Sequence, residues 1–159
     1  MASKALRGPF RKLIRQLELT LRKPIIKRFG PVGRRIDSRL YAKDSEAAFS
    51  GARQELAAMR ASGTRVTAGT SAAVDRRTGK VVGIGHARDD PPIPGPRKAV
   101  LPTKSLEKWS VTNCAEVAAA VQAIERGSKL EDLVIRTVRS SGVPFHPCKN
   151  CIQWIPGEA

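Results

Sequence analysis

The chain has 159 residues, 41% of them apolar, which is enough to bury the core of one globular domain. Residues 1–40 hold 12 Lys and Arg against Glu18 and Asp37, so +10 of the net charge of +15 lies there. Such a charge favours nucleic acid as a partner, and an anionic membrane second. No apolar run reaches the roughly 18 residues of a membrane span, which argues against a transmembrane segment.

The first 43 residues are predicted to form a basic helical extension. Residues 1–23 are rich in Arg, with apolar residues at helical spacing, which predicts a helix that packs on the rest of the protein. A transit peptide and a helix lying on a membrane surface are the alternatives. Pro and Gly over residues 24–33 predict a linker. We therefore expect an extension over 1–43 and a main domain over 44–159.

A helix and then a β-hairpin are predicted at the start of the main domain. Asp44 or Ser45 is a suitable N-cap, and the apolar stripe that follows stops before Gly63. Residues 64–74 are small and β-branched, and a turn separates them from a second strand over 80–87. The change of period from helix to strand predicts this order.

The second half of the domain is predicted to alternate between loop, helix and strand. Five prolines make residues 88–104 a long loop. Residues 114–126 then predict a helix, 130–139 a strand buried on both faces, and Cys148 opens a short helix that ends before Pro156. The order hairpin, helix, strand, helix predicts an α/β sandwich, with a helix crossover joined to an antiparallel hairpin.

The three cysteines, Cys114, Cys148 and Cys151, are too few for a disulfide framework and indicate a metal site or a reactive thiol in a reducing compartment. The two residues between Cys148 and Cys151 allow both cysteines to bind the same ion. A catalytic zinc ion takes three protein ligands and keeps its fourth position open. Three thiolates fit this number.

Glu116 follows Cys114 by two residues. In a helix interior the two side chains would point about 200° apart. They can share a site only if Cys114 lies at the helix end, outside helical geometry. Glu116 would then be a carboxylate that does not bind the metal and can carry protons between water and a substrate. Partial positive charge at helix N-termini would offset the charge of the thiolates.

The motif Cys-Ala-Glu at 114–116, followed by Pro-Cys-Lys-Asn-Cys at 147–151, resembles the zinc-dependent cytidine deaminase superfamily. The resemblance covers roughly residues 64–155. It implies the cytidine-deaminase-like α/β/α sandwich, the three cysteines as Zn²⁺ ligands, Glu116 as proton shuttle and Pro147 as the residue before the second ligand. The implied activity is hydrolytic deamination of a nucleobase, cytosine to uracil in DNA or RNA, with adenine and guanine left open.

Two branches of that superfamily compete. Free cytidine deaminases carry an Asn- and Glu-containing substrate motif that this chain lacks, and the chain ends eight residues after Cys151, without the last strands of that branch. The sequence looks more like the YwqJ-type deaminases of bacterial polymorphic toxins. That resemblance implies a secreted or delivered effector that acts in the cytoplasm of a target cell, with a cognate immunity protein as partner. Otherwise a cytoplasmic enzyme is expected.

Four further residues are candidates for binding the substrate. Trp109 could stack on a base or anchor its loop, and Asn113 could read the base or cap the helix. Pro147 and His146 lie beside the second ligand. His146 could line the pocket, bridge the loop or act as a fourth ligand. In the last case the protein would be a non-catalytic nucleic-acid-binding module with a structural zinc ion.

The remaining predictions concern one histidine, one tryptophan and the basic residues of the main domain. His86 is expected on the surface rather than at the metal, and Trp154 is expected to pack the last helix. The plausible phosphate contacts within the domain are Arg76, Arg77, Lys80, Arg97, Lys98, Lys104 and Lys108. The alternative for each of these cations is a solvated charge on the surface with no role in binding.

Overall fold

The computed structural model describes residues 31–93 and 101–156, with side chains described from residue 41 onward within those ranges. The helix predicted over residues 1–23, together with Arg97 and Lys98, lies outside the described residues. Within the described part, no helix is both long enough and apolar enough to cross a membrane.

Four strands form one antiparallel sheet in the order β2-β1-β3-β4. The central strand β1 (Gly69–Asp75) pairs with β2 (Lys80–His86) on one side and with β3 (Leu133–Arg139) on the other. The short strand β4 (Pro144–Phe145) completes the sheet next to β3. The predicted hairpin and the predicted burial of β3 on both faces are confirmed. β4 was not predicted, because two residues carry no periodic signal.

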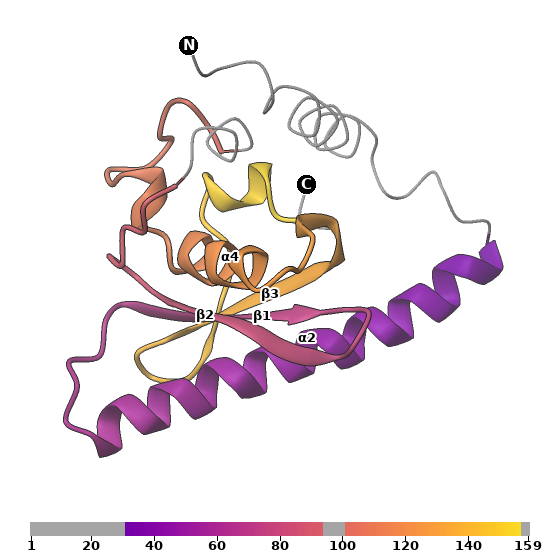
Figure 1. Ribbon diagram of the computed structural model, residues 1–159, viewed down its shortest axis with the longest axis horizontal. Helices are drawn as coiled ribbons and strands as arrows, with labels where there is room; N and C mark the ends of the chain where they lie inside the picture. The colour runs from indigo at the N-terminus through magenta and orange to yellow at the C-terminus, as the bar shows by residue number, and fades with distance from the viewer. Residues whose placement is uncertain (1–30, 94–100, 157–159) are drawn as a thin grey trace, which may run out of the picture.

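One helix covers each face of the sheet (Figure 1). The long helix α2 (Pro31–Ala61) packs on one face, where Leu56 and Val138 belong to the same buried cluster. The helix α4 (Ala115–Glu125) packs on the other face, in a cluster with Ile135. The fold is therefore mixed α/β with two α-helices among the described residues. Because β2 and β3 both run antiparallel to β1, they are parallel to each other, and α4 connects them across the sheet.

The start of α2 differs from the prediction. The helix begins at Pro31 rather than at Asp44 or Ser45, and proline is favoured in the first turn because that turn does not use its missing N–H group. Asp44 is buried, and Ser45 Oγ accepts a hydrogen bond of 2.7 Å from Nε of Arg136 on β3. Ser45 therefore serves a contact to the sheet and not a helix cap, and Asp44 is buried within the helix. The predicted division at residue 43 falls inside α2 and stays a prediction.

The helix predicted after Cys148 is also shorter than expected. Its place is taken by one turn of 3-10 helix over Cys151–Gln153. The N–H of Ile152 donates to the carbonyl of Cys148 (3.0 Å), but this bond does not extend into a regular α-helix.

Candidate metal centre

Cys114 lies at the N-cap of α4, where the backbone is extended (φ −73°, ψ 134°) and not helical. This is the geometry that the spacing of Cys114 and Glu116 requires if both are to face one site. The requirement stated from the sequence is therefore met. The cap carbonyl of Cys114 accepts a hydrogen bond of 3.1 Å from the N–H of Val117, which fixes the first turn of the helix.

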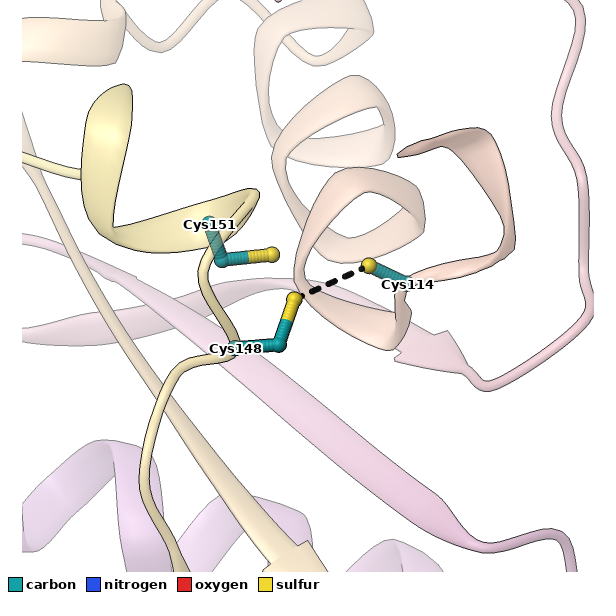
Figure 2. A group of neighbouring side chains, drawn as sticks. All are labelled: Cys114, Cys148 and Cys151. Atoms are coloured by element: carbon teal, nitrogen blue, oxygen red, sulfur yellow. Dashed lines mark hydrogen bonds between the residues drawn. The ribbon is translucent and has the colours of Figure 1, made fainter. Parts of the chain in front are cut away.

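The three cysteine thiols lie together at this helix end (Figure 2). Their sulfur atoms all lie within 4.8 Å of one another, and the Sγ atoms of Cys114 and Cys148 are 3.5 Å apart. The N–H of Ile152 donates to the carbonyl of Cys148 (3.0 Å), which closes the turn that carries Cys148 and Cys151. The three cysteines are close enough to bind one metal ion.

The thiols also share their protons unequally. Hydrogen bonds from the thiols of Cys114 and Cys151 hold the pKa of Cys148 well below its usual range, and the backbone N–H groups of Cys151 and Asn150 add to this effect. The pKa of Cys114 is raised, first because its thiol donates to Cys148. The pKa of Cys151 is raised in the same way, by Cys114 and then by Cys148. One thiolate is thus favoured in the protein itself, and thiolates are the form that binds a soft metal ion.

Glu116 lies on the first turn of α4 and is only 7% exposed. The hydroxyl of Thr137 on β3 donates a hydrogen bond of 2.9 Å to its Oε1, and the same hydroxyl lies 2.6 Å from Oγ of Ser71 on β1. Burial raises the pKa of Glu116, and the hydrogen bond from Thr137 partly opposes that rise. Among the described residues, Glu116 and His146 are not part of the cluster of three thiols that could hold a metal ion.

A pocket of about 240 Å³ opens beside the thiols. It is lined by two of the cysteines, by Glu116 and by residues from the ends of several elements, which are Ala68, Gly69, Ala87, Arg88, Trp109, Asn113, Cys114, Ala115, Glu116, Thr137, Phe145, His146 and Cys148. Three of the four predicted substrate-binding residues, Trp109, Asn113 and His146, therefore line this pocket. Pro147 does not line it.

Asn150 holds the loop that carries Trp109. This asparagine is fully buried, and its Oδ1 accepts a hydrogen bond of 2.7 Å from the N–H of Leu106. Its Nδ2 donates to Oγ of Ser105 (2.9 Å), and that hydroxyl donates to the carbonyl of Trp109 (2.6 Å). Trp109 itself remains 45% exposed. The segment between Cys148 and Cys151 thus positions the loop that carries this aromatic side chain beside the pocket.

Several residues of the pocket were not predicted from the sequence. Gly69, Thr137 and Phe145 meet there because β1, β3 and β4 pair at this end of the sheet, where Gly69 lies opposite Arg139 and Thr137 opposite Phe145. No local pattern signals such a meeting. Asn150 could have been noticed as a polar residue between two metal-ligand candidates, and Arg88 as the cation that follows β2.

The structure also places His86, Trp154 and the cations of the hairpin turn. Nε2 of His86 lies 2.8 Å from a carboxylate oxygen of Glu55 on α2, and His86 is absent from the residues that line the pocket. Trp154 is buried in the core on the α4 side of the sheet, as expected. The hairpin cations Arg76, Arg77 and Lys80 lie at the end of β1 opposite to Gly69 and hence away from the pocket.

Comparison of the chain with protein-family models, with curated proteins and with solved structures gives no match in any of the three. The thiol cluster and the buried carboxyl group of Glu116 meet at one pocket, and this chemistry is the guide to function.

Proposed function

We propose that the protein is a zinc-dependent hydrolytic deaminase of a nucleobase, most simply of cytosine to uracil in DNA or RNA. One observation carries this proposal. The extended N-cap at Cys114 directs its thiol toward Cys148 and Cys151, while Glu116 lines the same pocket without belonging to the thiol cluster. A set of metal ligands beside a separate, buried proton carrier is the arrangement that hydrolytic deamination requires.

The donor set fits zinc. Three thiolates in a buried cluster are soft ligands, and they leave the fourth position of a tetrahedral ion for a ligand that is not protein. A bound zinc ion supplies Lewis acidity, which activates water as a nucleophile near neutral pH. His146 lines the pocket but lies outside the cluster, and this favours a catalytic centre over the structural zinc of a non-catalytic nucleic-acid-binding module.

Glu116 is proposed as the proton carrier of the reaction. In deamination of cytosine, the oxygen of water forms a bond to C4, the bond from C4 to the amino nitrogen breaks, and ammonia leaves. One proton of the water is transferred to the ring nitrogen N3 and the other to the departing amino group. Thr137 orients the carboxyl group through its hydrogen bond to Oε1 of Glu116, and we assign the transfer of each proton to this carboxyl group. Burial raises the pKa of this carboxyl group and so favours the protonated form that gives protons back.

Two further pocket residues are assigned to the base. The exposed ring of Trp109 offers a surface on which a nucleobase can stack, and Asn113 offers both a donor and an acceptor to the edge of the base. The order hairpin, helix, strand, with one helix on each face of the sheet, supports the sandwich of the cytidine deaminase superfamily. We assign the chain to its YwqJ-type toxin branch, with delivery into a target cell and a neutralising immunity protein as the corresponding expectations.

The test is conversion of cytosine to uracil by the zinc-loaded full chain on single-stranded DNA, double-stranded DNA, RNA and free cytidine. We expect product on at least one polymer. Glu116→Gln is expected to lower turnover by about 10² to 10⁴-fold while the zinc content stays at one ion per chain. Glu125→Gln, the same change at the exposed far end of α4, is the matched control and should keep wild-type turnover.

Two results would reject the assignment. The first is the absence of product on every substrate by protein that has bound zinc, and the second is full turnover by Glu116→Gln. Activity on free cytidine alone would instead identify a nucleoside enzyme and reject the polymer substrate.

A further inference from the structure

Arg88 occupies an unusual backbone position directly after β2. The N–H of Asp89 donates to the carbonyl of His86 (3.1 Å), which closes a four-residue turn with Arg88 at its third position. The φ angle of Arg88 is 74°, in the left-handed region that favours glycine. Turns with a positive φ at this position normally use Gly or Asn there, because a larger side chain adds strain.

Other residues hold this turn in place. The carboxylate of Asp89 accepts a hydrogen bond of 2.7 Å from the N–H of His86, and it also lies 3.2 Å from Nδ1 of the His86 ring. The N–H of Arg88 donates to the carbonyl of Asn113 (2.9 Å), which ties the turn to the residue before Cys114. A glycine at position 88 could keep each of these bonds without strain. The use of arginine therefore points to a task for its side chain.

Arg88 is one of the residues that line the pocket. The two carboxylates next to it in the chain are already engaged, since Asp89 binds His86 and Asp90 accepts a hydrogen bond from Thr112. The ion pairs found among the described residues use other cations, and Arg88 forms none there. The pocket thus has a cation in its wall with no protein carboxylate assigned to it.

We propose that Arg88 binds a phosphate group of the substrate, so that the pocket takes a nucleotide or a nucleic-acid strand and discriminates against a free nucleoside. This inference rests on the proposed function, in which the base lies against the thiol cluster and Glu116. A guanidinium group presents paired N–H donors that match the oxygen atoms of a phosphate. The hairpin cations cannot take this role in the pocket, because they lie at the opposite end of β1.

Three variants test the assignment. Arg88→Gly removes the guanidinium group and relieves the backbone strain, so its melting temperature is expected to equal or exceed that of the wild type. Arg88→Lys keeps the charge but loses the paired donors. Lys129→Ala, at an exposed position next to the end of β3 that pairs with Asp75, removes one positive charge away from the pocket and is the control for net charge.

Binding is measured with zinc-loaded full chains that also carry Glu116→Gln, so that no substrate is consumed. The probes are deoxycytidine, deoxycytidine 5′-monophosphate and a single-stranded DNA dodecamer with one cytosine. Arg88→Gly is expected to weaken dodecamer binding at least 10-fold and to reduce the salt dependence of log K by about 0.7 for the lost phosphate contact. Binding of deoxycytidine should stay unchanged, Arg88→Lys should be intermediate, and Lys129→Ala should not affect binding of the monophosphate.

The outcomes separate the two proposals. A loss for both the monophosphate and the dodecamer assigns Arg88 to the phosphate of the target nucleotide, whereas a loss for the dodecamer alone assigns it to a neighbouring phosphate of the strand. Unchanged dodecamer binding by Arg88→Gly, or an equal loss for deoxycytidine, would overturn the assignment. If the wild type bound these probes through Arg88 but formed no uracil on any substrate, the deaminase proposal would fail and the phosphate site would stand.

Discussion

Gly85 lies beneath the first turn of α4 and controls how closely that helix approaches the sheet. A Cβ atom at this position would lie 2.2 Å from the carbonyl oxygen of Ala115 and 2.4 Å from the amide nitrogen of Ala119. Ordinary contacts begin near 3.4 Å. In Gly85→Ala the first turn of α4 must therefore retreat by about 1.2 Å, because the atoms that it meets are backbone atoms and cannot rotate away.

This retreat has two measurable effects. Overpacking of this size is expected to lower the free energy of unfolding by about 1–3 kcal/mol. Cys114 directly precedes Ala115, and metal-ligand distances tolerate changes of only about 0.2 Å, so zinc affinity should fall by at least about 10-fold. Gly83→Ala is the matched control. Its Cβ atom would lie 2.1 Å from the carbonyl oxygen of Ala119, a clash of the same size one helical turn further from the cysteine.

Urea unfolding of the zinc-free chains measures the first effect, and competition with a chromophoric chelator measures the second. The two variants should lose similar stability, whereas only Gly85→Ala should lose most of its zinc affinity. Wild-type zinc affinity in Gly85→Ala, or a greater loss in Gly83→Ala, would refute the idea that the approach of the first helical turn sets the geometry of the metal centre.

Three further outcomes are expected. The pKa of Asp75 is lowered from 3.8 to about 2, chiefly by the side-chain hydrogen bond from Arg77. Ionised Asp75 therefore adds about 2 kcal/mol to the free energy of unfolding above pH 4, and this is lost as the pH falls through 2. Urea unfolding between pH 2 and 6 should show the loss in the wild type and not in Asp75→Asn. Asn150→Ala should cost about 1–3 kcal/mol, since it leaves buried hydrogen-bonding groups unpaired, and acrylamide should then quench Trp109 more strongly. At a free zinc concentration of 100 times the dissociation constant, chelation of zinc should lower the free energy of unfolding of the wild type by about 2.7 kcal/mol. This should appear as a lower melting temperature, whereas the melting temperature of Cys148→Ser should not change.

The sequence alone predicted the elements that depend on local interactions. Small and β-branched residues on either side of a turn predicted the hairpin of β1 and β2. Apolar residues on one helical face predicted α4, and a continuous apolar run predicted the doubly buried β3. The spacing of Cys114 and Glu116 required the cysteine to lie outside helical geometry, and it does so at the N-cap. These features follow from dihedral preferences and helix periodicity, which act between residues close together in the chain.

Other features depended on contacts between distant parts of the chain. The early start of α2, the short strand β4 and the reduction of the last helix to one turn were missed or wrong, because local propensity is only a weak guide to where such elements begin and end. The pairing of β3 with β1 brought Thr137 to Glu116, and the turn after β2 brought Arg88 into the pocket. The candidates for metal binding and proton transfer could be named from residue types and their spacing. The residues that surround them could not, because strand pairing joins segments whose closeness no local pattern encodes.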